Sequence, residues 1–218
     1  MTSSTSPGRI TGPLKTWYDL HEALAHEATG IASDAEVLTV DGLDAFAARF
    51  WAFDRELRAH SEVEDGIMFP AISQRGGNAA LLHANATRTS DAIGALARPA
   101  AEMSDSLEAH LELEEATALT QVDGLFSNDE QAALFRTIIG SLPPDPQLQP
   151  WVAAALSPEH LEARLRNIAK SMSTPALTAL MTQIHDGVGA DTWSVVEART
   201  PDLAALVTAA GGERSDRS

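Results

Sequence analysis

The sequence predicts an all-α protein: an up-down-up-down four-helix bundle with a C-terminal cap of short helices. Apolar residues recur at alternating steps of three and four along several stretches, which is the spacing of one buried helix face. Mostly short turns separate the first four stretches, as in antiparallel bundles. In the second half, prolines after Ser or Thr mark the starts of shorter helices. The expected ranges are a disordered tail (1–12), the bundle (13–123), a helical C-terminal extension (124–210) and a second disordered tail (211–218).

The first helix is expected to run from Pro13 to about Gly30. Its buried face should consist of Leu14, Trp17, His21, Leu24, Ala28 and Ile31. His21 therefore takes a position in the core. His26 is rotated about 140° from His21 on a helix, so we expect it to face solvent.

The second helix is expected to run from Asp41, its N-cap, to near Pro70. Its buried face should hold Leu43, Phe46, Phe50, Phe53, Leu57, His60, Glu64 and Ile67. A histidine and a carboxylate thus occupy consecutive positions on a buried face. An unpaired ionised carboxylate in an apolar interior costs several kcal/mol. Because no Lys or Arg lies on this face, a bound cation is the expected compensation.

Two further helices complete the predicted bundle. The third, 79–97, presents small residues around His83. The fourth follows Pro99, ends at Asp123-Gly124 and should bury Met103, Leu107, His110, Glu114, Ala118 and Val122. His110 and Glu114 repeat the H-x-x-x-E spacing of His60 and Glu64. Residues four apart project from the same side of a helix, so both members of each pair can reach one metal.

Beyond the bundle, Ser127 and Glu130 form a predicted capping box for a fifth helix that ends near Gly140. Four prolines between residues 143 and 150 predict an extended linker. Short helices are then expected after Ser157-Pro158, Thr174-Pro175 and Thr200-Pro201. Gly211-Gly212 is expected to end the fold.

The composition restricts the partners and the chemistry. Fifteen Lys and Arg against 31 Asp and Glu give a net charge of −16, which disfavours nucleic acids and anionic membrane surfaces as partners. No apolar run approaches the about 18 residues of a membrane span, and no signal-peptide core is present, so a cytoplasmic location is expected. The oligomeric state is left open. Without cysteine, any metal must be held by nitrogen and oxygen.

The four predicted helices together offer one set of candidate metal ligands: His21, His60, Glu64, His83, His110 and Glu114. Each half of the bundle contributes one helix with a single histidine and one with an H-x-x-x-E pair. This arrangement can hold two metals bridged by two carboxylates. Four nitrogens and two carboxylates suit iron, manganese or zinc. We expect two iron ions, with manganese or zinc as less favoured alternatives.

Four parts of the sequence resemble the hemerythrin-like, or HHE cation-binding, domain family. They are DLHEAL at 19–24, HSEVEDGIMFP at 60–70, His83, and HLELEE at 110–115, and the match covers roughly 13–123. The resemblance implies a four-helix bundle with a non-haem di-iron centre that binds or reacts with dioxygen, peroxide or nitric oxide. It also implies that the four histidines are terminal ligands and that Glu64 and Glu114 are bridges. The segment around Pro150-Trp151 is similar to the helical extension of bacterial members.

Oxygen-carrying members of that family have a further histidine one turn after the third-helix ligand, where this sequence has Thr87. A missing ligand leaves an open position on a metal, which favours chemistry over reversible gas binding. The sequence therefore predicts a di-iron protein with catalase-like, oxygenase or oxidase chemistry on dioxygen, peroxide or another small molecule. Reversible binding or sensing of dioxygen, nitric oxide or iron is the alternative. A structural zinc bundle is a third hypothesis.

Two residues are candidates for supporting the metal from a second layer. One is Thr87. The other is Tyr18, which lies one turn before His21 and could hydrogen-bond an oxygen species, although core packing is the commoner role. Trp17 is expected to belong to the core.

The remaining polar residues near the motifs are expected to lie at the surface. Asp65, Glu112 and Glu115 fall off the buried faces, and Asp65 or Glu115 is also a candidate partner for a ligand histidine. His160 and His185, in the C-terminal half, are expected to be surface or packing residues.

Overall fold

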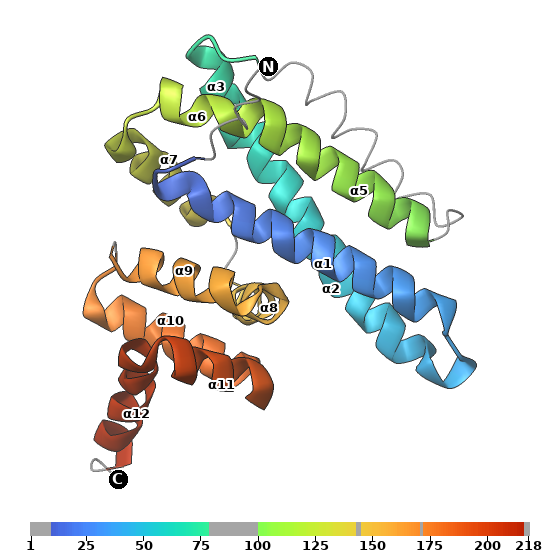
Figure 1. Ribbon diagram of the computed structural model, residues 1–218, viewed down its shortest axis with the longest axis vertical. Coiled ribbons are helices and arrows are strands. Elements are labelled where there is room, and N and C mark those ends of the chain that lie inside the picture. Colours follow the sequence, from blue (N-terminus) through green and yellow to red (C-terminus); the bar gives the residue numbers. More distant parts are fainter. Residues whose placement is uncertain (1–9, 79–99, 143–144, 171, 216–218) are drawn as a thin grey trace, which may run out of the picture. The chain divides into compact units, whose positions relative to one another are not determined.

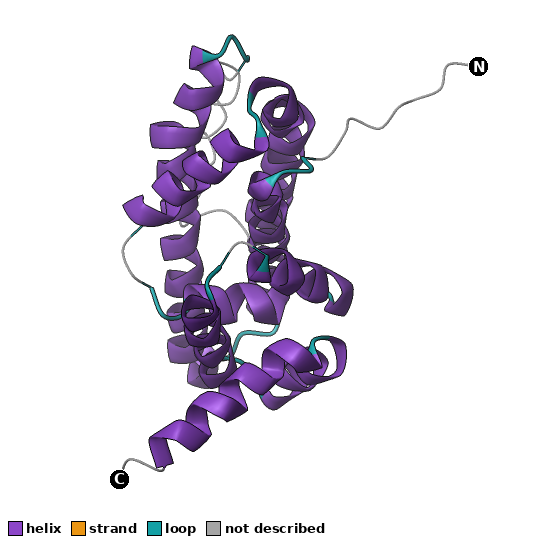
Figure 2. Cartoon of the chain, turned by 90° about the vertical axis from the view of Figure 1, so that its left-hand side faces the viewer, coloured by secondary structure: helices purple, strands orange, loops and turns teal. Residues whose placement is uncertain are grey.

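The computed structural model describes residues 10–78, 100–142, 145–170 and 172–215, with side chains to residue 208 (Figure 1). Within these ranges the chain is helical and has no strand (Figure 2). The all-α prediction is therefore confirmed. The predicted third bundle helix, with His83 and Thr87, lies outside the described residues, so the four-helix bundle stays a prediction. Two compact units divide the chain, Met1–Pro143 and Pro144–Ser218.

The first unit is built on three long helical segments. The first is η1 (Pro13–Lys15) with α1 (Thr16–Glu36). The second follows the 3-10 turn η2 (Val40–Gly42) and comprises α2 (Leu43–Val63), η3 (Glu64–Met68) and α3 (Phe69–Gln74). The third comprises α5 (Ala100–Glu114), η4 (Glu115–Leu119) and α6 (Thr120–Leu125). Because α1 packs against both α2 and α5, the three segments share one interior.

Burial along these helices follows the predicted faces, except on the second segment, where Ile67 is only half-buried and the start of α2 is not buried. Every residue of the predicted face on the first helix is buried, and so is every residue of the face on α5, η4 and α6. On α2, burial begins only at Phe53: Leu43 is exposed, and Phe46 and Phe50 are half-buried. Asp41 lies in η2, and the N-cap of α2 is Gly42, which makes no side-chain cap.

A π-helical turn begins at the glutamate of the first H-x-x-x-E pair, Glu64, and directly after the glutamate of the second, Glu114. In η3 the amide of Phe69 donates to the carbonyl of Glu64, five residues back. The wider turn buries both the fourth and the fifth residue after the glutamate, namely Met68 and Phe69 after Glu64 and Ala118 and Leu119 after Glu114. The helix was expected to end near Pro70, but it continues to Gln74. Pro70 falls in the first turn of α3, where its missing N–H is tolerated.

The predicted N-terminal tail is wrong at its last residues, because residues 10–12 are ordered against the first unit. Ile10 is buried in the apolar core, and the amide and hydroxyl of Thr11 both donate to Asp123 Oδ2 at 2.8 Å. The fifth helix, α7 (Asn128–Ser141), contacts η1 and has the predicted capping box between Ser127 and Glu130. It therefore belongs to the first unit, beyond residue 123 where the bundle was expected to end.

The second unit is helical, as predicted, but has more helices than expected. Its elements are α8 (Leu148–Ala155), α9 (Pro158–Ala169), α10 (Thr174–Gly187), α11 (Ala190–Arg199) and α12 (Pro201–Ser215). A helix begins at Leu148, where the prolines predicted an extended linker to Pro150. The helix α11 was not predicted, and α12 continues through Gly211-Gly212.

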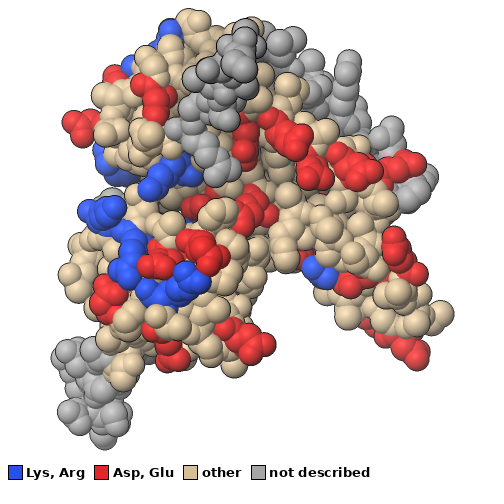
Figure 3. Space-filling model, viewed as in Figure 1, with Lys and Arg blue, Asp and Glu red and all other residues tan. Residues whose placement is uncertain are grey.

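No helix in the described part of the chain is long and apolar enough to cross a membrane. The outer face of α5 is acidic, as the composition predicts for much of the surface (Figure 3). Its exposed carboxylates are Glu102, Asp105, Glu108 and Glu112.

Candidate metal centre

Three helices bring five of the six predicted ligands into one buried layer. His21 comes from α1, His60 and Glu64 from α2 and the start of η3, and His110 and Glu114 from α5. Their exposed fractions lie between 0% and 6%. Apolar residues flank this layer along each helix in both directions. The sixth predicted ligand, His83, lies outside the described residues.

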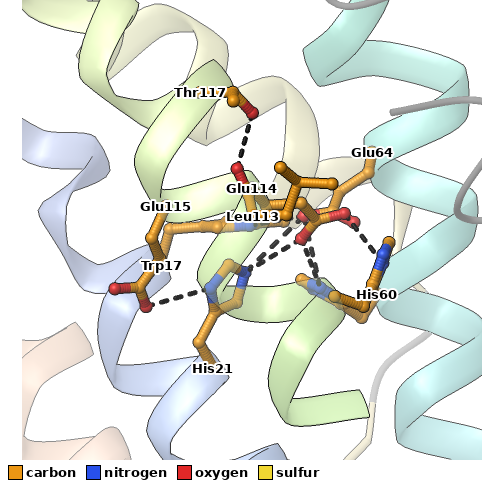
Figure 4. Close-up of polar contacts among 9 residues, drawn as sticks. Trp17, His21, His60, Glu64, Leu113, Glu114, Glu115 and Thr117 are labelled. Carbon is orange, nitrogen blue, oxygen red and sulfur yellow. Dashed lines mark hydrogen bonds and ion pairs between the residues drawn. The ribbon is translucent and has the colours of Figure 1, made fainter. Parts of the chain in front are cut away.

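The nitrogens and carboxylate oxygens of this layer converge (Figure 4). His21 Nε2 lies 3.7 Å from Glu64 Oε1 and 3.6 Å from Glu114 Oε2. His60 Nε2 lies 3.2 Å from Glu64 Oε1 and 4.0 Å from Glu114 Oε2. Two ligands that each lie 2.0–2.2 Å from one ion are about 3.0–3.5 Å apart at ordinary bond angles. The observed separations are close to that range.

Most of these polar atoms have no hydrogen-bond partner among the described residues. The unpartnered atoms are His21 Nε2, both ring nitrogens of His60, His110 Nδ1, Glu64 Oε2 and both oxygens of Glu114. Several of these nitrogens lie within 4.0 Å of a carboxylate oxygen, but the distance or the angles at the two atoms do not fit a hydrogen bond. Buried polar groups in folded proteins are nearly always paired. Lone pairs that converge without pairing are the expected arrangement of a metal-binding site.

Glu114 faces different histidines with its two oxygens. Its Oε1 lies 2.9 Å from His110 Nε2, whereas its Oε2 is the oxygen near His21 and His60. His21, His60, Glu64 and Glu114 form the tighter group, with one ligand atom from each lying within 4.8 Å of all the others. This buried group can hold a metal ion, and His110 extends it on the far side of Glu114.

The electrostatics of the metal-free layer reflect two carboxylates without a cationic partner. Within the described residues, neither Glu64 nor Glu114 is paired with Lys or Arg. Burial and the charge of Glu114 raise the pKa of Glu64 to about 7, although His21 and Trp17 act against this shift. Burial and the charges of His21 and His110 lower the pKa of His60 well below its usual range.

The pKa of His21 is raised most clearly among the histidines of the layer. Burial acts to lower its pKa, but the hydrogen bond with Glu115 and the carboxylates of Glu64 and Glu114 outweigh burial and raise the pKa to about 9. Burial also acts to lower the pKa of His110, but the nearby carboxylate of Glu114 outweighs it, and the pKa of His110 is raised. In the metal-free protein, a proton on His21 thus supplies positive charge, and a proton on Glu64 would remove one of the negative charges.

Two residues outside the predicted ligand set contact it directly. Glu115 Oε1 lies 3.2 Å from His21 Nδ1, which is the partnership that the sequence offered as one candidate. Trp17 Nε1 donates to Glu64 Oε1 at 2.8 Å, whereas the sequence predicted only a core role for this residue. A signal for it exists in the sequence, since Trp17 lies four residues before His21 on the same face and a buried indole N–H needs an acceptor.

The other candidates take the positions expected of surface or core residues. Tyr18 belongs to the apolar core, and its hydroxyl accepts the backbone N–H of Ile10 at 3.3 Å. His26, Asp65 and Glu112 are exposed, as are His160 and His185 in the second unit. Next to Glu114, the hydroxyl of Thr117 donates to the carbonyl of Leu113 at 2.6 Å and so provides this carbonyl with a partner in the π-helical turn.

No family model, curated protein or solved structure matches this chain. The hemerythrin-like resemblance therefore stays a prediction from the motifs. Metal binding at this site is inferred from the buried histidines and carboxylates that the fold brings together.

Proposed function

We propose that this chain is a metalloprotein of hemerythrin-like type, whose non-haem di-iron centre reacts with dioxygen or peroxide. The observation that carries the proposal is the convergence of donor atoms from His21, His60, Glu64 and Glu114 in a buried layer, where most of these atoms lack a hydrogen-bond partner among the described residues. Every other part of the proposal depends on these atoms binding a cation.

A cation is the simplest compensation for two buried carboxylates. Each ionised carboxylate that leaves water without a partner costs several kcal/mol. In the described residues, histidines and the Trp17 indole are the only groups near them that carry or donate a proton. The acidic outer face of α5 adds to the negative potential around the site, which favours the approach of cations.

Glu114 favours two metals over one. A carboxylate that bridges two ions presents one oxygen to each, and Glu114 has His110 beside Oε1 and His21 and His60 beside Oε2. The repeated H-x-x-x-E spacing, with a π-helical turn at or directly after each glutamate, gives the site an approximate internal symmetry. His83 is the remaining predicted ligand.

Iron is the metal that we propose, because neutral imidazole and carboxylate ligands without sulfur suit it. A bound iron pair would supply the electrons that the reduction of dioxygen or peroxide needs. The chain's own residues would orient the ligands and keep the site dry, since the layer is buried and flanked by apolar side chains. Thr87, in place of a further histidine, supports reaction over reversible gas binding.

The test begins with protein from iron-replete cells. Elemental analysis is expected to give about two irons per chain, about one in His83→Ala, and close to none in Glu114→Ala. Glu112→Ala, which changes an exposed neighbour, should match the wild type. Zinc in place of iron would support the structural zinc hypothesis, and a metal-free wild type that cannot be reconstituted would refute the proposal.

The second part of the test separates reaction from binding. Reduced protein is mixed with oxygenated buffer in a stopped-flow spectrometer, and peroxide decay is followed in parallel. We expect consumption of dioxygen or peroxide that Glu114→Ala abolishes. A stable spectral change that reverses when the gas is removed, without consumption, would favour a carrier or a sensor instead.

A further inference from the structure

We propose that Trp17 is a positioning residue of the metal centre, whose indole N–H holds Glu64 in one orientation. The inference rests on the proposed metal binding, but not on the identity of the metal or on its reaction. It assigns a role in metal binding to a residue whose position in the sequence predicts only core packing.

The contact is direct and fully inside the protein. Trp17 Nε1 donates to Glu64 Oε1 at 2.8 Å, and both residues are buried. The indole ring also lies against the histidines of the centre: its centroid is 5.2 Å from that of His60 at a tilt of 32°, and 6.5 Å from that of His21 in an edge arrangement. Trp17 thus contacts three members of the four-residue group.

The chemistry of indole limits what this contact can do. An indole N–H donates one hydrogen bond, accepts none and does not titrate in the physiological range. The indole nitrogen of Trp17 therefore cannot coordinate a metal ion or take a proton from the site. Its N–H donates to one lone pair of Glu64 Oε1 and so restricts the rotation of the Glu64 carboxylate. The other oxygen, Oε2, has no partner among the described residues.

The two carboxylates are consequently not equivalent. Both oxygens of Glu114 lack a hydrogen-bond partner in the described part of the chain. The polar groups near that side chain are the histidines that are themselves candidate metal ligands. Glu64 is restrained before any metal arrives. A preorganised ligand binds more tightly because less conformational freedom is lost on binding. Removal of partners that orient metal ligands typically weakens metal affinity by 10–100-fold.

Core packing alone makes a different prediction. If Trp17 only fills space, Trp17→Phe would cost stability but leave the metal affinity of the folded protein unchanged. If Trp17 positions Glu64, the loss of one N–H should weaken binding even where the fold is intact. The matched control is Trp51→Phe, since Trp51 is an exposed tryptophan on α2.

The experiment titrates the metal-free chain with Co²⁺ and follows the visible absorption of the bound cobalt. Trp17→Phe is expected to bind on the order of tenfold more weakly than Trp51→Phe, with a changed cobalt spectrum and unchanged far-UV circular dichroism. Affinities within twofold of each other in the two folded variants would overturn the inference while leaving the proposed function intact. A wild type that binds no Co²⁺ and no iron would overturn both.

A second measurement applies even if Trp17→Phe does not fold. The wild-type chain has four tryptophans, and Phe variants of Trp51, Trp151 and Trp193 identify the Trp17 indole N–H resonance by elimination. We expect this resonance to shift on addition of Zn²⁺ and to exchange slowly with solvent. A Trp17 resonance that Zn²⁺ leaves unmoved, while the Zn²⁺ binds, would refute the contact with a ligand.

Discussion

Glu115 lies on the outer side of His21, with its Oε1 3.2 Å from Nδ1, while the inner nitrogen of the same ring, Nε2, faces Glu64 and Glu114. Glu115 is 29% exposed and His21 is 2% exposed, so the pair joins the buried layer to the surface. A carboxylate on one ring nitrogen fixes the tautomer in which the other nitrogen offers its lone pair to a metal.

Replacement of this partner should weaken the site without emptying it. In Glu115→Gln a neutral amide replaces the carboxylate beside His21 Nδ1. We expect metal affinity to fall by about 10–100-fold. Competition with a chromophoric chelator measures the change. Glu112→Gln, three residues earlier and exposed, is the control. Equal affinities in the two variants would mean that Glu115 does not support His21.

The metal is expected to stabilise the protein through Glu114. A ligand at 100 times its Kd stabilises the native state by about 2.7 kcal/mol, which is roughly 5–10 °C in Tm for a chain of this size. Chelation of the wild type should therefore lower Tm by that amount. In Glu114→Gln the difference between the metal-loaded and chelated samples should disappear, whereas Glu112→Gln should keep it. Differential scanning calorimetry with and without chelator checks both.

The stability of the metal-free protein and its affinity for metal should respond to pH in opposite directions. The folded-state pKa of His21 is raised to about 9, above its ordinary value, so the stabilisation by its proton is lost as pH rises through that value. The pKa of Glu64, about 7, is also raised, so its ionisation acts in the same direction. Metal binding displaces these protons, and therefore the affinity should rise with pH between about 7 and 9.

The measurement compares Tm across this interval with chelator and with metal. Tm of the chelated protein should fall towards pH 9, and the gap between the two samples should widen. Calorimetric titrations in two buffers of different ionisation enthalpy should detect proton release at pH 7. A gap that stays constant with pH would contradict the protonation of His21 in the metal-free site.

The ordered N-terminal segment should contribute measurably to stability. Ile10 is 4% exposed and lies in the same apolar cluster as Trp17 and Tyr18. Ile10→Ala is expected to cost about 2 kcal/mol, the low end for buried isoleucine, because a terminal segment can undock without global unfolding. Ile139→Ala, at a position that is 47% exposed, is the control and should stay within about 0.5 kcal/mol. Urea denaturation measures both, and equal effects would argue against docking of the segment.

The sequence alone determined that five of the predicted ligands lie on buried helix faces of the first unit. Steps of three and four put His60 and Glu64 on one face and His110 and Glu114 on another, and all four are buried. The same rule put His26 and Glu112 in solvent. The Ser127 capping box was also readable, because it joins residues three apart. Such features depend on local geometry, which the chain's own spacing sets.

Only the tertiary structure decided how these faces meet. The contact of Glu115 with His21 joins residues 94 apart, and that of Trp17 with Glu64 joins residues 47 apart. Both depend on the rotation and separation of packed helices, which periodicity within one helix does not report. The docking of Ile10 and Thr11 beside α6, and the π-helical turns that bury both Met68 and Phe69, have the same origin. Burial of apolar surface across helices outweighed the local preference for a disordered tail and a helix end at Pro70.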